Sequence, residues 1–253
     1  MAIQILGDPW DTISGCTKIS AGCKHCYAER FTEKMIGNKV AKYKAGFHEV
    51  VCHEYVLKLP TQRGESKTFF VNSMSDTFHK DVPLEFLQDI FIMMNNRLQH
   101  TFQVLTKRSD RMFELTPYLN YSDNIWQGVS VEREDCLYRI DDLRKSPARI
   151  KFVMFEPLLG RLGKINLEGI DWVIVGGESG NKFRPMDTPW VREIRDQCLD
   201  AGVKFVFKQY SAHYPDSLGR LLDGREWNER PLYESERHKV VKQTNPIFEE
   251  FTF

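Results

Sequence analysis

Short apolar runs recur along the chain, and most are followed by a polar or glycine-containing turn. The runs are rich in β-branched and aromatic residues and show little polar alternation, which is typical of strands buried on both faces of a parallel sheet. An earlier strand is expected in Ala2 to Leu6 or around Trp10 to Ile13. The six later runs predict strands at 68–72, 101–105, 125–129, 150–154, 172–175 and 203–207.

Helical patterns lie between several of these strands. Residues 83–98 carry apolar side chains at positions 84, 87, 90, 91, 94 and 98, which form one stripe of a helix. A second helix is predicted over 132–144. A third is predicted over 190–201, with Thr188 as N-cap, Pro189 at the first helical position and Gly202 as the C-terminal cap.

Alternating strands and helices predict parallel βαβ units and therefore an α/β fold. About six or seven strands suit a partial (β/α)6-type parallel barrel better than a closed eight-stranded one. We expect residues 1–210 to form this barrel, with residues 30–67 as an insertion. Residues 211–253 are expected to form a C-terminal appendage packed on the same domain, and Asp223-Gly224 predicts a hairpin within it.

Composition narrows the class of protein. The chain has 253 residues, 42% of them hydrophobic, and a formal net charge of zero. It shows neither a secretory signal nor an apolar run of about 20 residues, so a cytoplasmic protein without a membrane partner is expected. The neutral charge argues against a large nonspecific polyanion-binding surface but leaves room for a local basic groove, for example at 34–44.

Three cysteines lie close together near the N-terminus, at Cys16, Cys23 and Cys26. Three thiolates with no obvious fourth suit an iron–sulfur cluster with one iron left open, because clusters that only transfer electrons normally have four cysteine ligands. An open metal position can bind a substrate or cofactor, as in catalytic zinc sites. This interpretation makes the protein an enzyme.

Other interpretations of the cysteines remain open at this stage. A structural zinc site would take His25 or a distant residue as its fourth ligand, although His25 lies between two of the cysteines. A third interpretation is that the cysteines bind no metal. A disulfide framework fits poorly, because the domain is large and has six cysteines. The remaining three, Cys52, Cys136 and Cys198, lie in apolar or helical contexts and are interpreted as packing thiols.

The predicted strands end in polar residues. The carboxyl ends of parallel strands meet at one rim of a barrel, so we expect these side chains to line its mouth together with the cysteines. Polar loops are also common without any function. The strand ends carry Ser73, Ser75 and Asp76, then Thr106 to Arg108, Ser130 and Glu132, Glu156, the Gly176-Gly177-Glu178 sequence, and Lys208-Gln209.

Gly176-Gly177-Glu178 is the most distinctive of these strand ends. Glycines after a buried strand let a ligand approach the backbone, and the carboxylate can pair with an ammonium group. The alternative is a tight turn between strand and helix. The spacing matches neither a dinucleotide fingerprint nor a phosphate-binding loop.

A three-cysteine loop at the start of an incomplete parallel barrel resembles the radical S-adenosylmethionine superfamily. The usual spacing there is Cys-x3-Cys-x2-Cys with an aromatic residue before the third cysteine, whereas here six residues separate Cys16 from Cys23 and His25 takes the aromatic position. The superfamily's Gly-Gly-Glu normally follows the second strand, but in this chain it comes several strands later. Ser73, Ser75 and Asp76 occupy the equivalent place.

A closer resemblance extends from about residue 8 to 232. The chain is similar to a largely uncharacterised phage and bacterial family with three cysteines, which resembles radical S-adenosylmethionine enzymes. For a phage-encoded member the location implied is the host cytoplasm. The resemblance is carried by Gly15 to Lys18, Gly22-Cys23, Cys26 to Glu29, Asn72 to Asp76, Leu105 to Arg108, Glu156 to Gly160, Val175 to Gly180 and Phe207 to Gln209.

These resemblances imply a radical S-adenosylmethionine enzyme. The three cysteines would hold a 4Fe–4S cluster, and a 5′-deoxyadenosyl radical would abstract hydrogen from a substrate such as a nucleoside or nucleic acid. A reductant such as flavodoxin or ferredoxin would be a partner. The alternative is a non-catalytic nucleic-acid-binding module with a structural zinc or iron–sulfur site. The implied contacts to cofactor or substrate are Ser73, Ser75, Asp76, Glu156, Gly176, Gly177 and Glu178.

Overall fold

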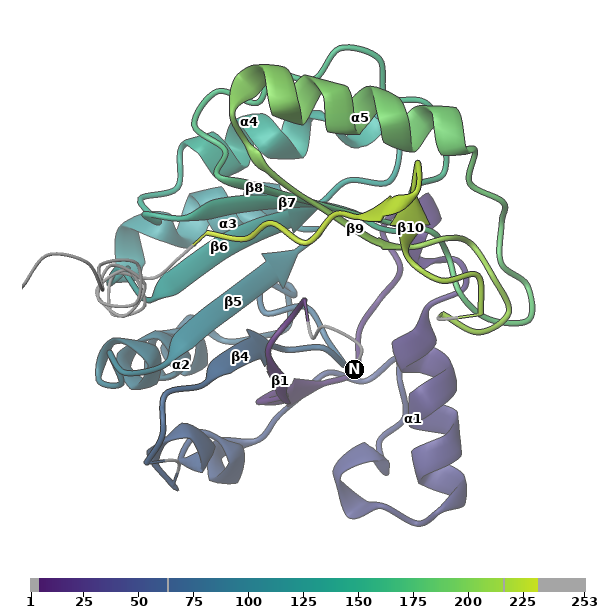
Figure 1. The fold of residues 1–253 in the computed structure, drawn as a ribbon. Helices are drawn as coiled ribbons and strands as arrows, with labels where there is room; N and C mark the ends of the chain where they lie inside the picture. The colour runs from purple at the N-terminus through teal and green to yellow at the C-terminus, as the bar shows by residue number, and fades with distance from the viewer. Residues whose placement is uncertain (1–4, 63, 216, 232–253) are drawn as a thin grey trace, which may run out of the picture.

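The computed structural model describes residues 5–62, 64–215 and 217–231. Seven strands form one curled, open half-barrel in which every neighbouring pair is parallel (Figure 1). The order follows the sequence: β1 (Asp8–Trp10), β4 (Thr68–Val71), β5 (Thr101–Thr106), β6 (Ile125–Ser130), β7 (Lys151–Phe155), β8 (Trp172–Gly176) and β9 (Lys204–Gln209). The predicted α/β partial barrel is confirmed.

The six later strands lie where the sequence predicts them, with bounds shifted by one or two residues. The first strand does not. β1 falls between the two predicted ranges and shares only Trp10 with them, because its register pairs Asp8 with Phe69 of β4. A separate antiparallel ribbon of β2 (Ile13–Ser14) and β3 (Val51–Cys52) brings the 30–67 insertion back beside the start of the cysteine loop.

Within the described residues, four helices cover the outer face of the sheet and a fifth stands apart from it (Figure 1). The outer helices are α2 (Leu84–Asn95), α3 (Ser109–Leu115), α4 (Tyr138–Arg144) and α5 (Thr188–Ala201), and the fifth is α1 (Tyr27–Gly37). Gly202 ends α5 with a φ of 67°, as expected, but the N-cap is Asp187. The short 3-10 turns are η1 (Ala21–Cys23), η2 (Ala41–Tyr43), η3 (Glu54–Val56), η4 (Leu59–Gln62), η5 (Thr116–Tyr118) and η6 (Glu134–Cys136).

The strands carry apolar side chains on both faces, so the sheet has a hydrophobic core on each of its faces. The larger core packs the outer face against the helices and includes Val153 and Phe155 of β7. The smaller core lies on the inner face, with Phe152 and Met154 of the same strand. The remaining inner members are Trp126, Trp172, Ile174 and Val206. Successive side chains of a strand point to opposite faces of the sheet. Counting from these core residues therefore shows which strand-end residues point into the barrel.

The C-terminal part contains the predicted hairpin. β10 (Leu221–Leu222) pairs with β11 (Arg225–Glu226), and Asp223 and Gly224 between them have φ angles of 55° and 80°. These positive values are what a two-residue hairpin turn requires. Trp227 then packs against Phe205 of the main sheet. Residues 232–253 of the predicted appendage lie outside the described residues, and the division at residue 210 stays a prediction.

No helix in the part of the chain described here combines the length and apolar character needed to cross a membrane.

Candidate functional site

The three cysteines lie on one loop at the carboxyl-terminal rim of the sheet. We call residues 15–26 the cysteine loop. Cys16 follows β2, Cys23 ends η1 and Cys26 immediately precedes α1. All three side chains are half-buried free thiols. Within the described ranges, no group of three His, Cys, Asp or Glu side chains is arranged as a metal site, although the donor set suits a cluster because thiolate is the usual iron–sulfur ligand.

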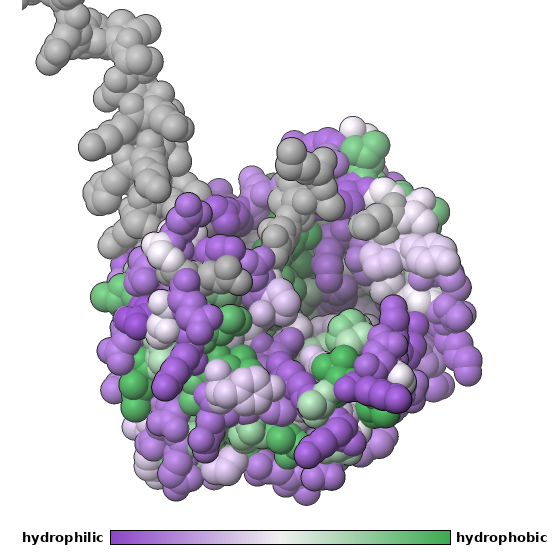
Figure 2. All heavy atoms as spheres, turned by 90° about the horizontal axis from the view of Figure 1, so that it is seen from below, coloured by the Kyte–Doolittle hydropathy of each residue, from purple (hydrophilic) through white to green (hydrophobic). Residues whose placement is uncertain are grey.

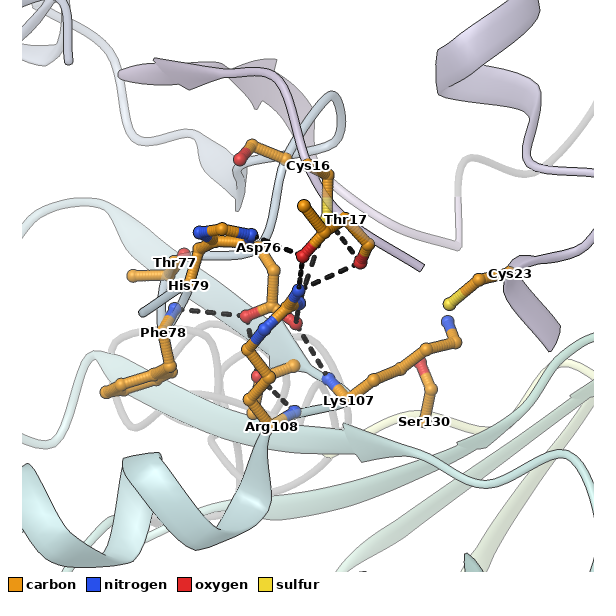
Figure 3. A network of polar contacts seen from close by, with 12 residues as sticks. Cys16, Thr17, Cys23, Asp76, Thr77, Phe78, His79, Lys107, Arg108 and Ser130 are labelled. Atoms are coloured by element: carbon orange, nitrogen blue, oxygen red, sulfur yellow. Dashed lines mark hydrogen bonds and ion pairs between the residues drawn. The ribbon is translucent and has the colours of Figure 1, made fainter. Parts of the chain in front are cut away.

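An ion pair between Asp76 and Arg108 holds the first part of the loop (Figure 3). Arg108 Nη1 lies 3.0 Å from Asp76 Oδ2 and donates to Cys16 Sγ over 3.7 Å, while Nη2 donates to the carbonyl of Thr17 over 2.9 Å. Burial raises the pKa of the Cys16 thiol to about 11, and the charge of Asp76 adds to this while Arg108 opposes it. Arg108 is thus a cation in contact with a candidate ligand sulfur.

Asp76 is fully engaged by protein donors. Besides Arg108, its carboxylate accepts hydrogen bonds from Thr106 Oγ1 at 2.6 Å, from the Lys107 backbone N–H at 3.0 Å and from the Phe78 backbone N–H at 3.0 Å. These bonds tie the end of β4 to the end of β5. The carboxylate therefore acts on the cysteine loop through Arg108.

A second ion pair holds the middle of the loop and is deeply buried. Glu132 Oε2 accepts from Arg139 at 2.9 Å, and the two side chains are 0% and 3% exposed. The other oxygen accepts from the backbone N–H of Gly22 at 3.1 Å. Burial alone would raise the pKa of Glu132, but the hydrogen bond from Ser20 and the positive charges of Lys107 and Arg139 outweigh it and lower the pKa.

A third ion pair holds the end of the loop. Arg184 donates to both oxygens of Glu178, at 2.9 Å from Nε and 2.5 Å from Nη2, and its backbone N–H donates over 2.8 Å. Arg184 also donates to the carbonyl of Ala21, and His25 Nδ1 lies 3.2 Å from Glu178. Burial tends to raise the pKa of Glu178, but the bonds from Arg184 and His25 lower it.

Three guanidinium–carboxylate pairs thus hold the cysteine loop at its beginning, middle and end. The acids follow alternate strands: Asp76 comes after β4, Glu132 after β6 and Glu178 after β8. The sequence predicts that the acids gather at one rim. It gives no signal for their partners Arg139 and Arg184, because these pairings depend on how the helix and loop after each strand fold back.

The predicted serines face the N-terminal segment. Ser73 Oγ donates to both oxygens of Asp11, at 2.9 and 3.1 Å, and Ser75 Oγ donates to the carbonyl of Gly15 at 2.5 Å. Tyr27 Oη donates to the carbonyl of Ser73. These bonds connect the loop after β4 to both ends of the cysteine loop.

Of the two glycines of the Gly-Gly-Glu sequence, Gly177 is required by close packing against backbone, and Gly176 is close to a side chain. A Cβ at Gly177 would lie 2.2 Å from the backbone nitrogen of Ser211, and one at Gly176 would lie 3.1 Å from the carboxyl carbon of Glu156. Contact with Ser211 therefore accounts for glycine at position 177, whereas the Glu156 side chain beside Gly176 is able to shift. The role of the Gly-Gly-Glu sequence in binding a ligand stays a prediction.

Glu156 is the predicted contact that points into the barrel. It lies two residues after Met154 of the inner core, and Lys208 lies two residues after Val206, so both share the inner face. Lys208 Nζ lies 2.8 Å from each oxygen of Glu156. Figure 3 shows Lys107 extending from the same rim toward Cys23 and Ser130.

The curled sheet leaves one side of the molecule open. Figure 2 shows that the face seen from below in Figure 1 is hollowed, with hydrophilic and hydrophobic residues both around the hollow. The inner core occupies the amino-terminal part of the sheet, where Ile5 and Leu6 pack against it. The polar inner residues occupy the carboxyl-terminal part, beside the cysteine loop.

Comparisons with known proteins give a family without an assigned activity. The family described as "Protein of unknown function (DUF5131)" matches residues 1–231, so the chain belongs to this family. No curated protein matches the chain significantly.

Two solved structures share similarity with the chain. One is spore photoproduct lyase complexed with dinucleoside spore photoproduct, at 12% identity and a TM-score of 0.40, covering 93% of this chain and 71% of that chain. The other is a mutant of the lyase with bound AdoMet and the same dinucleoside, at 11% identity and a TM-score of 0.42, covering 96% and 75%.

Proposed function

We propose that this member of the DUF5131 family is a radical S-adenosylmethionine enzyme. Cys16, Cys23 and Cys26 would hold three irons of a 4Fe–4S cluster and leave the fourth for the cofactor. The observation that carries the proposal is a loop of three half-buried free thiols fixed at the rim of an open parallel half-barrel. When bound, cluster and cofactor would supply one-electron cleavage of the sulfonium to methionine and a 5′-deoxyadenosyl radical, which abstracts hydrogen.

The protein's own contribution is to position the ligands. Three ion pairs fix the loop without occupying the thiols, apart from the donation of Arg108 to Cys16. Hydrogen bonds to ligand sulfurs are a recognised means of tuning such clusters. Asp76 and Glu178, both predicted contacts, serve the site in this proposal as positioning residues, as do Ser73 and Ser75.

The inner face of the rim would receive the cofactor or substrate. Glu156 and Lys208 form an ion pair there, and Lys107 adds a second cation. The apolar inner core beneath them closes the barrel toward its amino-terminal end and excludes water from that side. Gly176 carries no side chain beside the ion pair, since a Cβ there would lie 3.1 Å from the carboxyl carbon of Glu156. The chemistry would require a one-electron donor, such as a flavodoxin or ferredoxin.

The test is reconstitution of the purified chain under anaerobic conditions with iron and sulfide. We expect about four irons per chain and, after reduction with dithionite, production of 5′-deoxyadenosine from S-adenosylmethionine. A triple Cys→Ser variant of residues 16, 23 and 26 is the control and should bind no cluster. Zinc near one per chain with negligible iron would contradict the proposal and favour the binding module with a structural metal.

A further inference from the structure

We propose that an exposed face of α1 binds single-stranded nucleic acid and leads it to the rim of the barrel. The face consists of Tyr27, Arg30, Phe31 and Lys34, and we call it the α1 track. The inference rests on the proposed function, because it names the substrate class of the same site.

The four residues of the track lie on one side of the helix. Positions i, i+3, i+4 and i+7 are neighbours on a helix surface. Tyr27 is 54% exposed and Phe31 is 42% exposed, whereas Ala28 and Thr32 are buried on another side. Packing of α1 on the rest of the chain therefore leaves two aromatic rings and two cations facing solvent.

The track begins at the candidate site. Tyr27 directly follows Cys26 and donates to the carbonyl of Ser73, after β4. Arg30 donates to the carbonyl of Ser179, after β8, over 3.1 Å. The guanidinium lies so close to Gly180 that a Cβ there would be 2.0 Å from Nη1. The first turn of α1 thus contacts two strand-end loops of the rim, and the second turn leads away from it (Figure 1).

The surroundings of the track are positively charged although the chain as a whole is neutral. Residues 18–44 contain seven Lys and Arg against two Glu, a local net charge of +5, while the formal charge of the chain is zero. One of the acids, Glu29, is paired with Lys18 at 2.6 Å. The other, Glu33, is exposed and lies beside Arg30 at the i+3 position, so it borders the track, and the local net charge already includes it. The exposed lysines of this region are Lys18, Lys24, Lys34, Lys39 and Lys44.

Cations interleaved with exposed aromatic rings match a single-stranded polynucleotide. Phosphates are bound by lysine and arginine, and unpaired bases stack on tyrosine and phenylalanine. A duplex keeps its bases stacked inside, so it would use the cations and leave the rings without a partner. An enzyme that acts on a base also needs that base unstacked, and a single strand supplies it without the cost of unpairing.

The experiment uses the full chain without cluster and a fluorescent oligothymidylate of about 15 nucleotides, with anisotropy measured at several salt concentrations. We expect salt-dependent binding that is stronger than to a duplex of equal length. Phe31→Leu should weaken binding about tenfold with an unchanged salt slope, since stacking is worth about 1–3 kcal/mol per base. This variant keeps an apolar contact with Tyr43, against which the ring of Phe31 packs.

Charge variants provide the second arm. Lys34→Glu should weaken binding and lower the salt slope, and Lys34→Arg should restore both. Lys164→Glu is the matched control, because it makes the same charge change at an exposed position in the segment between β7 and β8, away from the track. Its binding should equal that of the wild type.

Two outcomes would overturn the inference: unchanged binding in both Phe31→Leu and Lys34→Glu, or a preference for duplex. Iron content after reconstitution is measured on the same preparations. If the wild type takes up the cluster but the track variants bind as the wild type does, the inference fails and the proposed function stands. If the oligonucleotide binds through the track and no iron is taken up, the proposed function fails instead.

Discussion

At the scale of single residues, Glu132 shows how much the site depends on buried charge. It is completely buried, and it connects Arg139 on one side to the backbone of Gly22 on the other. Removing one partner of a buried ion pair leaves the other charge without compensation, which is far more costly than losing an exposed pair. The residue stabilises both the fold and the position of the cysteine loop.

We therefore expect Glu132→Gln to lower the free energy of unfolding by about 3 kcal/mol or more. Glu134→Gln, two positions away and exposed, should change it by less than about 0.5 kcal/mol. Urea unfolding followed by circular dichroism measures both.

The double variant Glu132→Gln/Arg139→Met removes both charges and should recover at least half of the loss. If the double variant is as unstable as the sum of the two single variants, uncompensated charge is not the cause.

Sequence alone predicts the acids of this site but not their use. Asp76 and Glu178 stand out because they follow buried strands, and a strand-end carboxylate is readily interpreted as a ligand contact. Their arginines come from different places: Arg108 lies between β5 and α3, immediately before the helix, whereas Arg184 lies in the segment before α5. Tertiary packing decides which guanidinium pairs with which carboxylate. The periodicity and spacing of residues in the sequence therefore do not predict these pairs.

At the scale of elements, the cysteine loop is shaped by its glycines. Gly15, just before Cys16, has a φ of 83°, and a Cβ there would lie 1.9 Å from the carbonyl oxygen of Glu49. Gly46 has a similar φ of 90° but has no atom within 4 Å of the corresponding position. The two glycines therefore share a backbone conformation that would strain any residue with a side chain, and they differ in the space around them.

This pair allows a matched test of the loop. Gly46→Ala should destabilise the protein by about 1–2 kcal/mol, which is the cost of the left-handed conformation alone. Gly15→Ala adds a clash with backbone that cannot rotate away, so its loss should be at least twice as large.

Gly15→Ala should also slow uptake of iron during reconstitution, because the turn positions Cys16, and Gly46→Ala should not. Thermal unfolding and iron content measure the two effects. If both variants lose the same stability, the added Cβ at position 15 does not clash with the backbone of Glu49 at any cost in free energy.

Elements that contain a long run of buried residues were predictable from the sequence. Elements with few residues were missed. The six later strands are packed on both faces, so each one is a nearly continuous apolar run in the sequence. Buried strands of parallel sheets generally have this pattern. Helix α3 spans seven residues, too few to show a clear period, and it was not predicted. β1 has three residues, so the pairing with β4 determines where it begins.

At the scale of the whole molecule, the fold concentrates titratable groups around the cysteine loop. Two buried histidines flank Cys16. His53 Nε2 lies 2.8 Å from Ser14 Oγ, and His79 Nε2 lies 2.7 Å from Thr17 Oγ1. Burial, together with Lys42 for the first and Arg108 for the second, lowers the pKa of both below 6.5. The two histidines are therefore neutral in the folded protein at pH 7.

These pKa shifts predict that stability falls in two stages as the pH decreases. A histidine whose folded pKa lies below its unfolded value binds protons preferentially when unfolded, so its contribution is complete above pH 6.5 and is lost progressively below it. The carboxylates of Glu132 and Glu178 also have lowered pKa values, relative to 4.5, so their contribution is present above that pH and is lost as the pH falls through their folded values.

We expect the melting temperature of the cluster-free chain to fall between pH 7.5 and 5.5 and to fall more steeply below pH 4.5. The double variant His53→Gln/His79→Gln should flatten the first stage and leave the second, because glutamine keeps a hydrogen-bonding amide but does not titrate. His213→Gln, at an exposed position, should reproduce the wild-type profile. If the melting temperature of the double variant still falls between pH 7.5 and 5.5, the two histidines do not cause that fall. The acid sensitivity would then arise from groups outside the region around Cys16.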